Sequence, residues 1–131
     1  MKGIRKKMKE EVMIHSDMEA PYSAAIMMDN ELYVSGQLPV ENGKEIMPED
    51  IGMQTDICMR NIKDLVEKAG FSMTDIVKTT IYTTDISKIS QINASYIKYF
   101  KKPYPARCAC EVSKLARGAK VEIECVARSM R

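Results

Sequence analysis

The sequence is poor in several residues and motifs on which common enzyme classes depend. It contains no tryptophan, two phenylalanines and a single histidine, His15, in 131 residues. It has no glycine-rich phosphate loop and no Gly-x-Ser-x-Gly motif, which argues against P-loop nucleotide chemistry and against a serine hydrolase. No apolar run approaches the roughly 20 residues that a membrane-spanning helix needs. We therefore expect neither a nucleotide-phosphate site nor a membrane span.

The four cysteines show no spacing typical of a disulfide framework. They are Cys58, Cys108, Cys110 and Cys125, and the basic N-terminal stretch is followed by no apolar segment of the kind that a secretory signal contains. A zinc site would need more ligands than Cys108 and Cys110, and His15 is far from both in sequence. We expect reduced thiols that pack as small apolar groups, no metal, no cofactor and a cytoplasmic location.

The length predicts one domain over residues 1–131, in which residues 1–10 form a flexible basic tail. The formal net charge is +2, with 20 basic and 18 acidic residues. Such a mild balance does not call for a nucleic-acid partner. The tail could add only weak, salt-sensitive binding to a polyanion.

Hydrophobic periodicity predicts strands and helices in a defined order. A short strand over residues 11–16 precedes two strands over 23–28 and 32–37, which are joined by the Asp29-Asn30-Glu31 turn. A helix over 50–69, a strand over 75–84 and a second helix over 85–100 follow, before strands over 106–112 and 120–128. This order is typical of an α+β domain with one sheet whose helices cover one face.

The last two strands carry charged residues within otherwise small or apolar segments. Alternation separates Arg107 from Cys108 and Cys110, and separates Glu122 and Glu124 from the apolar residues of their strand. An arginine fork suits a small carboxylate, and a half-buried glutamate can handle protons. We expect Arg107, Glu122 and Glu124 on the face that the helices leave open. The alternative is a surface ion pair, which is common and energetically weak.

Several short stretches together resemble the reactive-intermediate deaminase A family (RidA, also called YjgF or L-PSP). The resemblance extends over nearly the whole chain. The matching stretches are Pro21-Tyr22-Ser23, residues 33–39 (YVSGQLP), residues 61–70 followed by DIVK at 75–78, Asn93-Ala94-Ser95-Tyr96, Tyr104-Pro105-Ala106-Arg107 and Val121-Glu122-Ile123-Glu124.

The resemblance implies a chorismate-mutase-like fold, a single mixed six-stranded sheet with two helices packed on one face. It also implies a homotrimer with ligand clefts between subunits, and hydrolysis of 2-aminoacrylate and related imines to 2-keto acids and ammonium. By position, Arg107 matches the arginine that binds the substrate carboxylate, and Glu122 matches the glutamate proposed to activate water. Ser35 and Gly36 would line the cleft, with Tyr22 and Asn93 nearby.

Two positions depart from the family pattern. Ala109 stands where the family often has a cysteine, and Ala24 stands where a glutamine is usual. Because neighbouring strand residues face opposite ways, neither Cys108 nor Cys110 simply replaces that cysteine. Two other functions stay open: an endoribonuclease or translation inhibitor, and a non-catalytic sensor of small carboxylates that uses the same cleft.

Overall fold

A computed structural model describes residues 8–13, 20–41 and 47–130. Its centre is a six-stranded sheet in the order β1-β2-β3-β6-β4-β5. The strands are β1 (Glu10–Val12), β2 (Ala25–Met28), β3 (Glu31–Gln37), β4 (Ile76–Thr83), β5 (Ala106–Glu111) and β6 (Val121–Arg128). Only the β4–β5 pair is parallel within the described sheet, so the predicted mixed sheet is confirmed.

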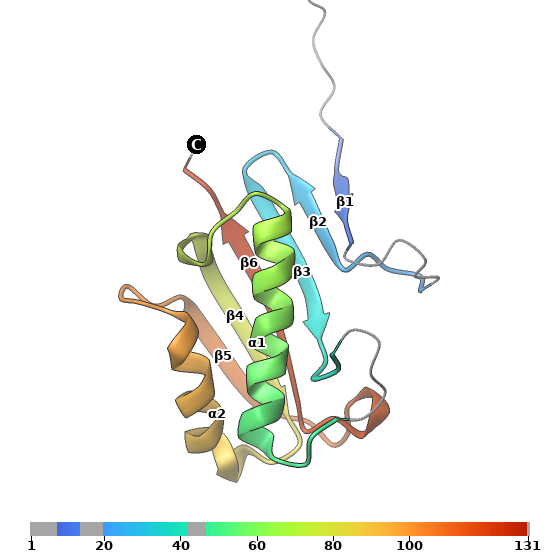
Figure 1. The fold of residues 1–131 in the computed structure, drawn as a ribbon, viewed down its shortest axis with the longest axis vertical. Helices are drawn as coiled ribbons and strands as arrows, with labels where there is room; N and C mark the ends of the chain where they lie inside the picture. The colour runs from blue at the N-terminus through green and yellow to red at the C-terminus, as the bar shows by residue number, and fades with distance from the viewer. Residues whose placement is uncertain (1–7, 14–19, 42–46, 131) are drawn as a thin grey trace, which may run out of the picture.

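Both α-helices lie on one face of this sheet, as predicted (Figure 1). Helix α1 (Ile51–Lys68) crosses β3 and β6, and α2 (Ile89–Tyr96) lies beside α1. The core fills the layer between them. Its largest fully buried apolar side chains are Leu32, Met59, Ile62, Leu65, Ile81, Ile92 and Ile123. The opposite face of the sheet has no covering element among the described residues.

The predicted first helix is confirmed, and both of its ends are explained by the residues that flank it. Asp50 caps the start by accepting a hydrogen bond from the Met53 amide at 2.9 Å. Gly70 follows the helix with φ of 83°, a left-handed conformation that glycine adopts without strain. The Phe71 amide then returns to the Val66 carbonyl, which closes the last turn.

The predicted second helix is shorter and interrupted. The chain forms a 3-10 helix η2 (Ile86–Lys88), then α2, then a second 3-10 helix η3 (Ile97–Tyr99). Asp85 caps η2 through the Ser87 amide, so the predicted start is right although the first turn is 3-10. Two further 3-10 segments lead into strands: η1 (Met73–Asp75) precedes β4, and η4 (Ala116–Gly118) precedes β6.

The hairpin between β2 and β3 is also confirmed. Asp29 adopts φ of 54° at the turn, a conformation that aspartate tolerates better than most residues. The predicted strand over 11–16 is wrong at its end, since β1 ends at Val12 and Met13 is already outside it; residues 14–16, with His15, lie outside the described residues. Residues 1–7 of the predicted tail lie outside them too, and Glu10 already belongs to β1. No helix in the described parts of the chain is long and apolar enough to span a membrane.

Candidate active site

Arg107 lies on β5, at the edge of the sheet beside α2. Its Nη1 donates a hydrogen bond to Asn93 Oδ1 at 2.7 Å. Its guanidinium carbon lies 5.1 Å from the centre of the Tyr96 ring. The Tyr96 hydroxyl is in turn hydrogen-bonded to buried Thr79 Oγ1 at 2.7 Å. The structure therefore brings together Arg107 and Asn93, two of the predicted site residues, and adds Tyr96 and Thr79.

The prediction that Arg107 shares the open face with Glu122 and Glu124 is wrong. Arg107 pairs with Thr79 of β4, which is buried under the helices, so both side chains point to the helix-covered face. The alternation along β5 was predicted correctly, but the residues expected on the open face lie on the helix-covered face. An edge strand beside a short helix lets a long side chain reach solvent from the covered side, which alternation alone does not reveal.

The same register places the neighbouring small residues. Cys108 and Cys110 pair with Thr80 and Tyr82 on the open face, whereas Ala109 pairs with buried Ile81 on the covered face. Neither cysteine therefore takes the place of the family cysteine at position 109, as expected.

Glu122 and Glu124 do lie on the open face, opposite Tyr82 and Thr80 of β4. Partial burial raises the pKa of Glu122 above its ordinary value, and the nearby Glu124 charge raises it further. A carboxylate with a raised pKa is a stronger base once it is ionised. Of the two glutamates, Glu122 has the environment that proton transfer requires.

Gly36 is the residue against which the Glu122 side chain packs. A methyl group built on Gly36 would lie 2.1 Å from Glu122 Oε2 and 2.8 Å from Glu122 Cδ. Strand β3 changes register between Val34 and Gln37, so Gly36 sits in a local irregularity of the ladder. Within the chain, the group that comes closest to the missing side chain of Gly36 is therefore the Glu122 carboxylate.

Ser35 precedes Gly36 on β3, and Tyr22 precedes the segment to which Ser35 bonds. Ser35 Oγ donates to the Ser23 carbonyl at 2.6 Å, and its amide donates to the Ala24 carbonyl. These bonds tie β3 to the segment that follows Tyr22. The Tyr22 side chain is 57% exposed.

Four of the six predicted site residues thus form two groups on opposite faces of one sheet. Arg107 and Asn93 lie on the covered side, whereas Glu122 and Gly36 lie on the open side. A single chain does not bring all six to one ligand.

Tyr96 and Thr79 are site residues that sequence reasoning missed. Tyr96 is a buried residue of α2, with 7% of its surface exposed. Asn93 and Tyr96 are three residues apart and so share one face of α2. That spacing was the available signal.

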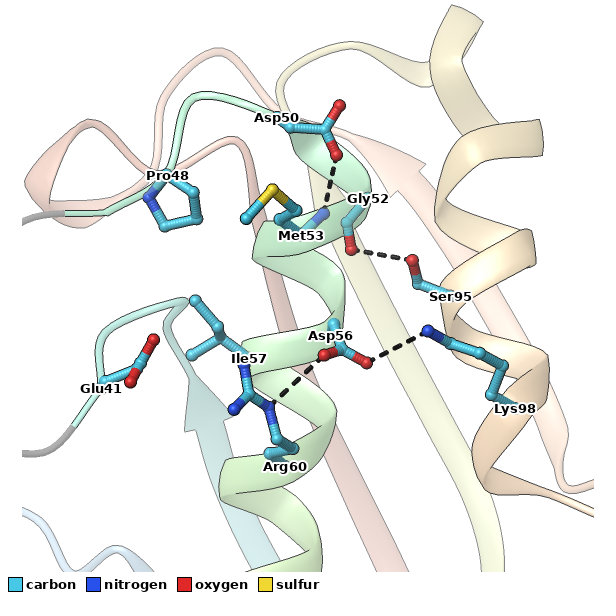
Figure 2. A pocket seen from close by; sticks show the side chains of 10 residues that line it. All are labelled: Glu41, Pro48, Asp50, Gly52, Met53, Asp56, Ile57, Arg60, Ser95 and Lys98. Carbon is cyan, nitrogen blue, oxygen red and sulfur yellow. Dashed lines mark hydrogen bonds and ion pairs between the residues drawn. The ribbon is translucent and has the colours of Figure 1, made fainter.

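The structure also contains a surface depression of about 300 Å³ between the start of α1 and the end of α2, away from these groups (Figure 2). Its charged residues bond mainly to one another: Asp56 pairs with Arg60 at 3.4 Å and with Lys98 at 3.5 Å. None of the predicted site residues lines it. Within the described ranges, no cluster of three or more histidine, cysteine or acidic side chains could hold a metal ion.

Comparisons with known proteins find one family model and several relatives of similar length. Residues 13–129 match the family model described as Endoribonuclease L-PSP. A RutC family protein of Buchnera aphidicola is 43% identical over 82% of this chain and 86% of its own. A 2-iminobutanoate/2-iminopropanoate deaminase of Bos taurus is 35% identical over 82% of this chain and 79% of its own. A solved structure of a putative endoribonuclease from Thermotoga maritima has a TM-score of 0.87 and 34% identity, covering 95% of this chain and all of that one.

Proposed function

Because the chain belongs to the Endoribonuclease L-PSP family, which is also the RidA/YjgF family, we propose that it hydrolyses small 2-imino acids to 2-keto acids and ammonium. The substrates would be the 2-aminoacrylate and 2-iminopropionate type. The bovine relative, named as a deaminase of such imines, supports the reaction class. Supporting geometry comes from Arg107 and Glu122.

The observation that carries the proposal is that the Arg107 guanidinium is exposed and held only by uncharged partners. The side chain is exposed, and the partners that the structure gives it, Asn93 and Tyr96, are both uncharged. In the described part of the chain no carboxylate pairs with it. A positive charge that is oriented but not neutralised suits a substrate carboxylate, which it can hold through two parallel hydrogen bonds.

Glu122 supplies the acid–base group in this proposal. Its carboxylate takes a proton from a water molecule, whose oxygen forms a bond to the imine carbon and gives a carbinolamine. The proton held by Glu122 then passes to the nitrogen, and the hydroxyl group loses its proton as the carbon–nitrogen bond breaks. The products are the keto acid and ammonia, which takes up the released proton as ammonium. The imine is already electrophilic, so positioning and proton transfer are sufficient help.

Since Arg107 and Glu122 lie on opposite faces of the sheet, the proposal requires two copies of the chain. We propose a homotrimer in which Arg107 of one subunit and Glu122 of its neighbour face a shared cleft. The open face supports such an assembly, because it carries exposed apolar side chains: Met28 and Tyr33 are each 46% exposed. Ser35, Gly36 and Tyr22 would join the cleft from the Glu122 side, and Asn93 from the Arg107 side.

A coupled assay tests this function. A serine or threonine dehydratase generates the imine in place, and keto-acid release is followed with and without the protein. Faster release is expected from the wild type and should be lost in Arg107→Ala and Glu122→Gln. Lys114→Ala, which removes an exposed cation after β5, and Glu124→Gln are the matched controls and should retain turnover. No acceleration by folded wild-type protein would refute the deaminase.

Two other functions, an endoribonuclease and a sensor, would give different results from the deaminase. The family description and the Thermotoga maritima structure both carry the word endoribonuclease. RNA cleavage by wild-type protein that persists in Arg107→Ala would favour that activity. Keto-acid binding without turnover in the wild type would instead indicate a sensor.

A further inference from the structure

The partners that orient Arg107 both come from the segment that connects β4 to β5. Asn93 and Tyr96 lie on α2, and Arg107 is the second residue of β5. We propose that Tyr96 is a positioning residue for Arg107: its ring, anchored by Thr79, holds the guanidinium so that one edge stays available to a carboxylate. The purpose of this arrangement rests on the proposed function, whereas the arrangement itself is visible in the structure.

The Tyr96 ring is itself held in place. Its hydroxyl shares a buried hydrogen bond with Thr79, a residue that is 1% exposed. The Phe100 ring lies 4.9 Å from it, tilted by 48°. A ring with its hydroxyl bonded in the core and a second ring beside it has little freedom to rotate. It therefore offers a fixed surface to the cation.

The contacts of Arg107 leave a defined part of its guanidinium free. Nη1 donates to Asn93, and the Tyr96 ring lies within cation–π distance of the planar group. The N–H groups of Nε and Nη2 have no partner among the described residues. A carboxylate takes two parallel N–H donors from one edge of an arginine, so this remaining edge has the required number of donors.

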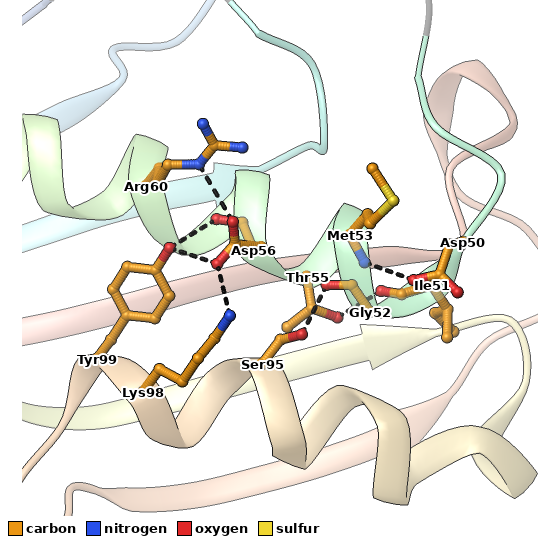
Figure 3. Close-up of polar contacts among 10 residues, drawn as sticks. All are labelled: Asp50, Ile51, Gly52, Met53, Thr55, Asp56, Arg60, Ser95, Lys98 and Tyr99. Carbon is orange, nitrogen blue, oxygen red and sulfur yellow. Dashed lines mark hydrogen bonds and ion pairs between the residues drawn. The ribbon is translucent and has the colours of Figure 1, made fainter.

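Helix α2 is fixed in turn to α1 by polar contacts on its other side (Figure 3). Ser95 Oγ donates to the Gly52 carbonyl at 2.8 Å, and Tyr99 Oη donates to Asp56 Oδ1 at 2.7 Å. Asp56 also pairs with Lys98. Ser95 immediately precedes Tyr96, and Lys98 and Tyr99 follow it within three residues. The support for the guanidinium therefore extends into the main helix of the fold.

The experiment compares Tyr96→Leu, which removes the ring, with Tyr96→Phe, which removes only the hydroxyl. The first readout is the 15N relaxation order parameter of the Arg107 Nε–H group, assigned by its absence in Arg107→Ala. The second is the affinity for pyruvate, a small keto acid, by titration calorimetry, with KM and kcat from the coupled assay. Ile92→Val, a buried change on the same helix, controls for a general loss of stability.

In Tyr96→Leu we expect a lower order parameter, a pyruvate affinity weakened by about three- to tenfold, and a rise in KM larger than any fall in kcat. Tyr96→Phe should lie between wild type and Tyr96→Leu, and Ile92→Val should match wild type in all readouts. An unchanged order parameter in Tyr96→Leu would overturn the proposal. If the wild type neither binds pyruvate nor accelerates hydrolysis, the proposed function fails, while the order parameters still decide the role of Tyr96.

Discussion

The carboxylate of Glu122 occupies the space that a side chain on Gly36 would fill. A methyl group on Gly36 would lie 2.1 Å from Glu122 Oε2, and the three atoms nearest to it all belong to the Glu122 side chain. Glycine at position 36 therefore leaves the space in which the Glu122 carboxylate lies, and a methyl group there would displace that carboxylate. The choice of residue at position 36 therefore determines where the side chain of Glu122, 86 positions later, can lie.

Gly36→Ala is expected to displace the Glu122 carboxylate and to lower kcat by about tenfold or more, since general base catalysis depends on position. The coupled assay measures this loss. Stability provides an independent check by a double-mutant cycle. Gly36→Ala should lower the melting temperature in the wild type but not in a Glu122→Ala background, where the colliding atoms are gone.

Gly52→Ala is the control for this prediction, because it adds the same methyl group within α1, far from the open face. The atoms nearest to this added methyl group would be Asp50 Oδ2 at 3.1 Å and Ser95 Oγ at 3.4 Å. Turnover should stay close to that of the wild type. Equal losses in Gly36→Ala and Gly52→Ala would contradict the link between Gly36 and Glu122.

The pH profile of kcat/KM should have an acidic limb set by Glu122. The pKa of Glu122 is raised by partial burial and then by Glu124, and only the ionised form can accept a proton from water. Activity should therefore rise with pH through a pKa above the ordinary glutamate value. Glu124→Gln removes the charge contribution and should move this limb to lower pH. A limb that does not move would mean that another group controls it.

The same pKa predicts how stability changes with pH. Because folding raises the pKa of Glu122, the folded state binds its proton more tightly than the unfolded state does. The stability associated with this group is present at acid pH, below the unfolded pKa, and is lost as pH rises through the folded pKa. Glu122→Gln should therefore be more stable than wild type near neutral pH. The difference should shrink toward acid pH in denaturant melts at several pH values.

Assembly should depend on the open face of the sheet. Val126 lies on that face, paired with Tyr33 and Lys78, and is half-buried in the single chain. Val126→Glu places a charge at its centre and should dissociate the proposed trimer, with loss of turnover. Met53→Glu, on the outer surface of α1, should leave both unchanged. The mass of each variant, measured by sedimentation, shows whether the trimer dissociates. A wild-type monomer with full activity would contradict the shared cleft.

The hydroxyl of Tyr99 stabilises the contact between the helices. Its hydrogen bond is the main cause that lowers the pKa of Asp56, ahead of the Lys98 and Arg60 charges. Tyr99→Phe should cost about 1–2 kcal/mol in the free energy of unfolding near neutral pH. Since a lowered aspartate pKa gives stability that is lost as pH falls through the folded value, the cost should diminish in acid. Denaturant titration at two pH values measures it.

The sequence was sufficient for elements whose signals are local. Hydrophobic periodicity predicted a helix over 50–69, within one residue of the observed ends of α1. The alternation in β6 correctly separated buried Val121 and Ile123 from Glu122. Each of these signals depends on residues within a few positions of one another.

The side of the sheet on which Arg107 lies could not be predicted in the same way. Alternation shows which residues share a face, but the choice of covered face depends on pairing with Thr79, 28 positions earlier. Asn93 and Tyr96 had the spacing of one helical face, yet only packing shows that this face meets the arginine. The grouping of the site residues is a tertiary property, and for the proposed cleft it is a quaternary one.

The parallel pairing of β4 with β5 has a consequence for changes in chain length. A parallel neighbour must be reached by a crossing connection, and here that connection, residues 84–105, also builds the support on which Arg107 rests. The connection is also bonded to α1 through Ser95 and Tyr99, so its position relative to Arg107 depends on both contacts. Insertions within residues 84–105 would shift the support relative to the side chain that it holds. The length of this connection is thus constrained by the side chain that it supports and not only by the distance that it has to span.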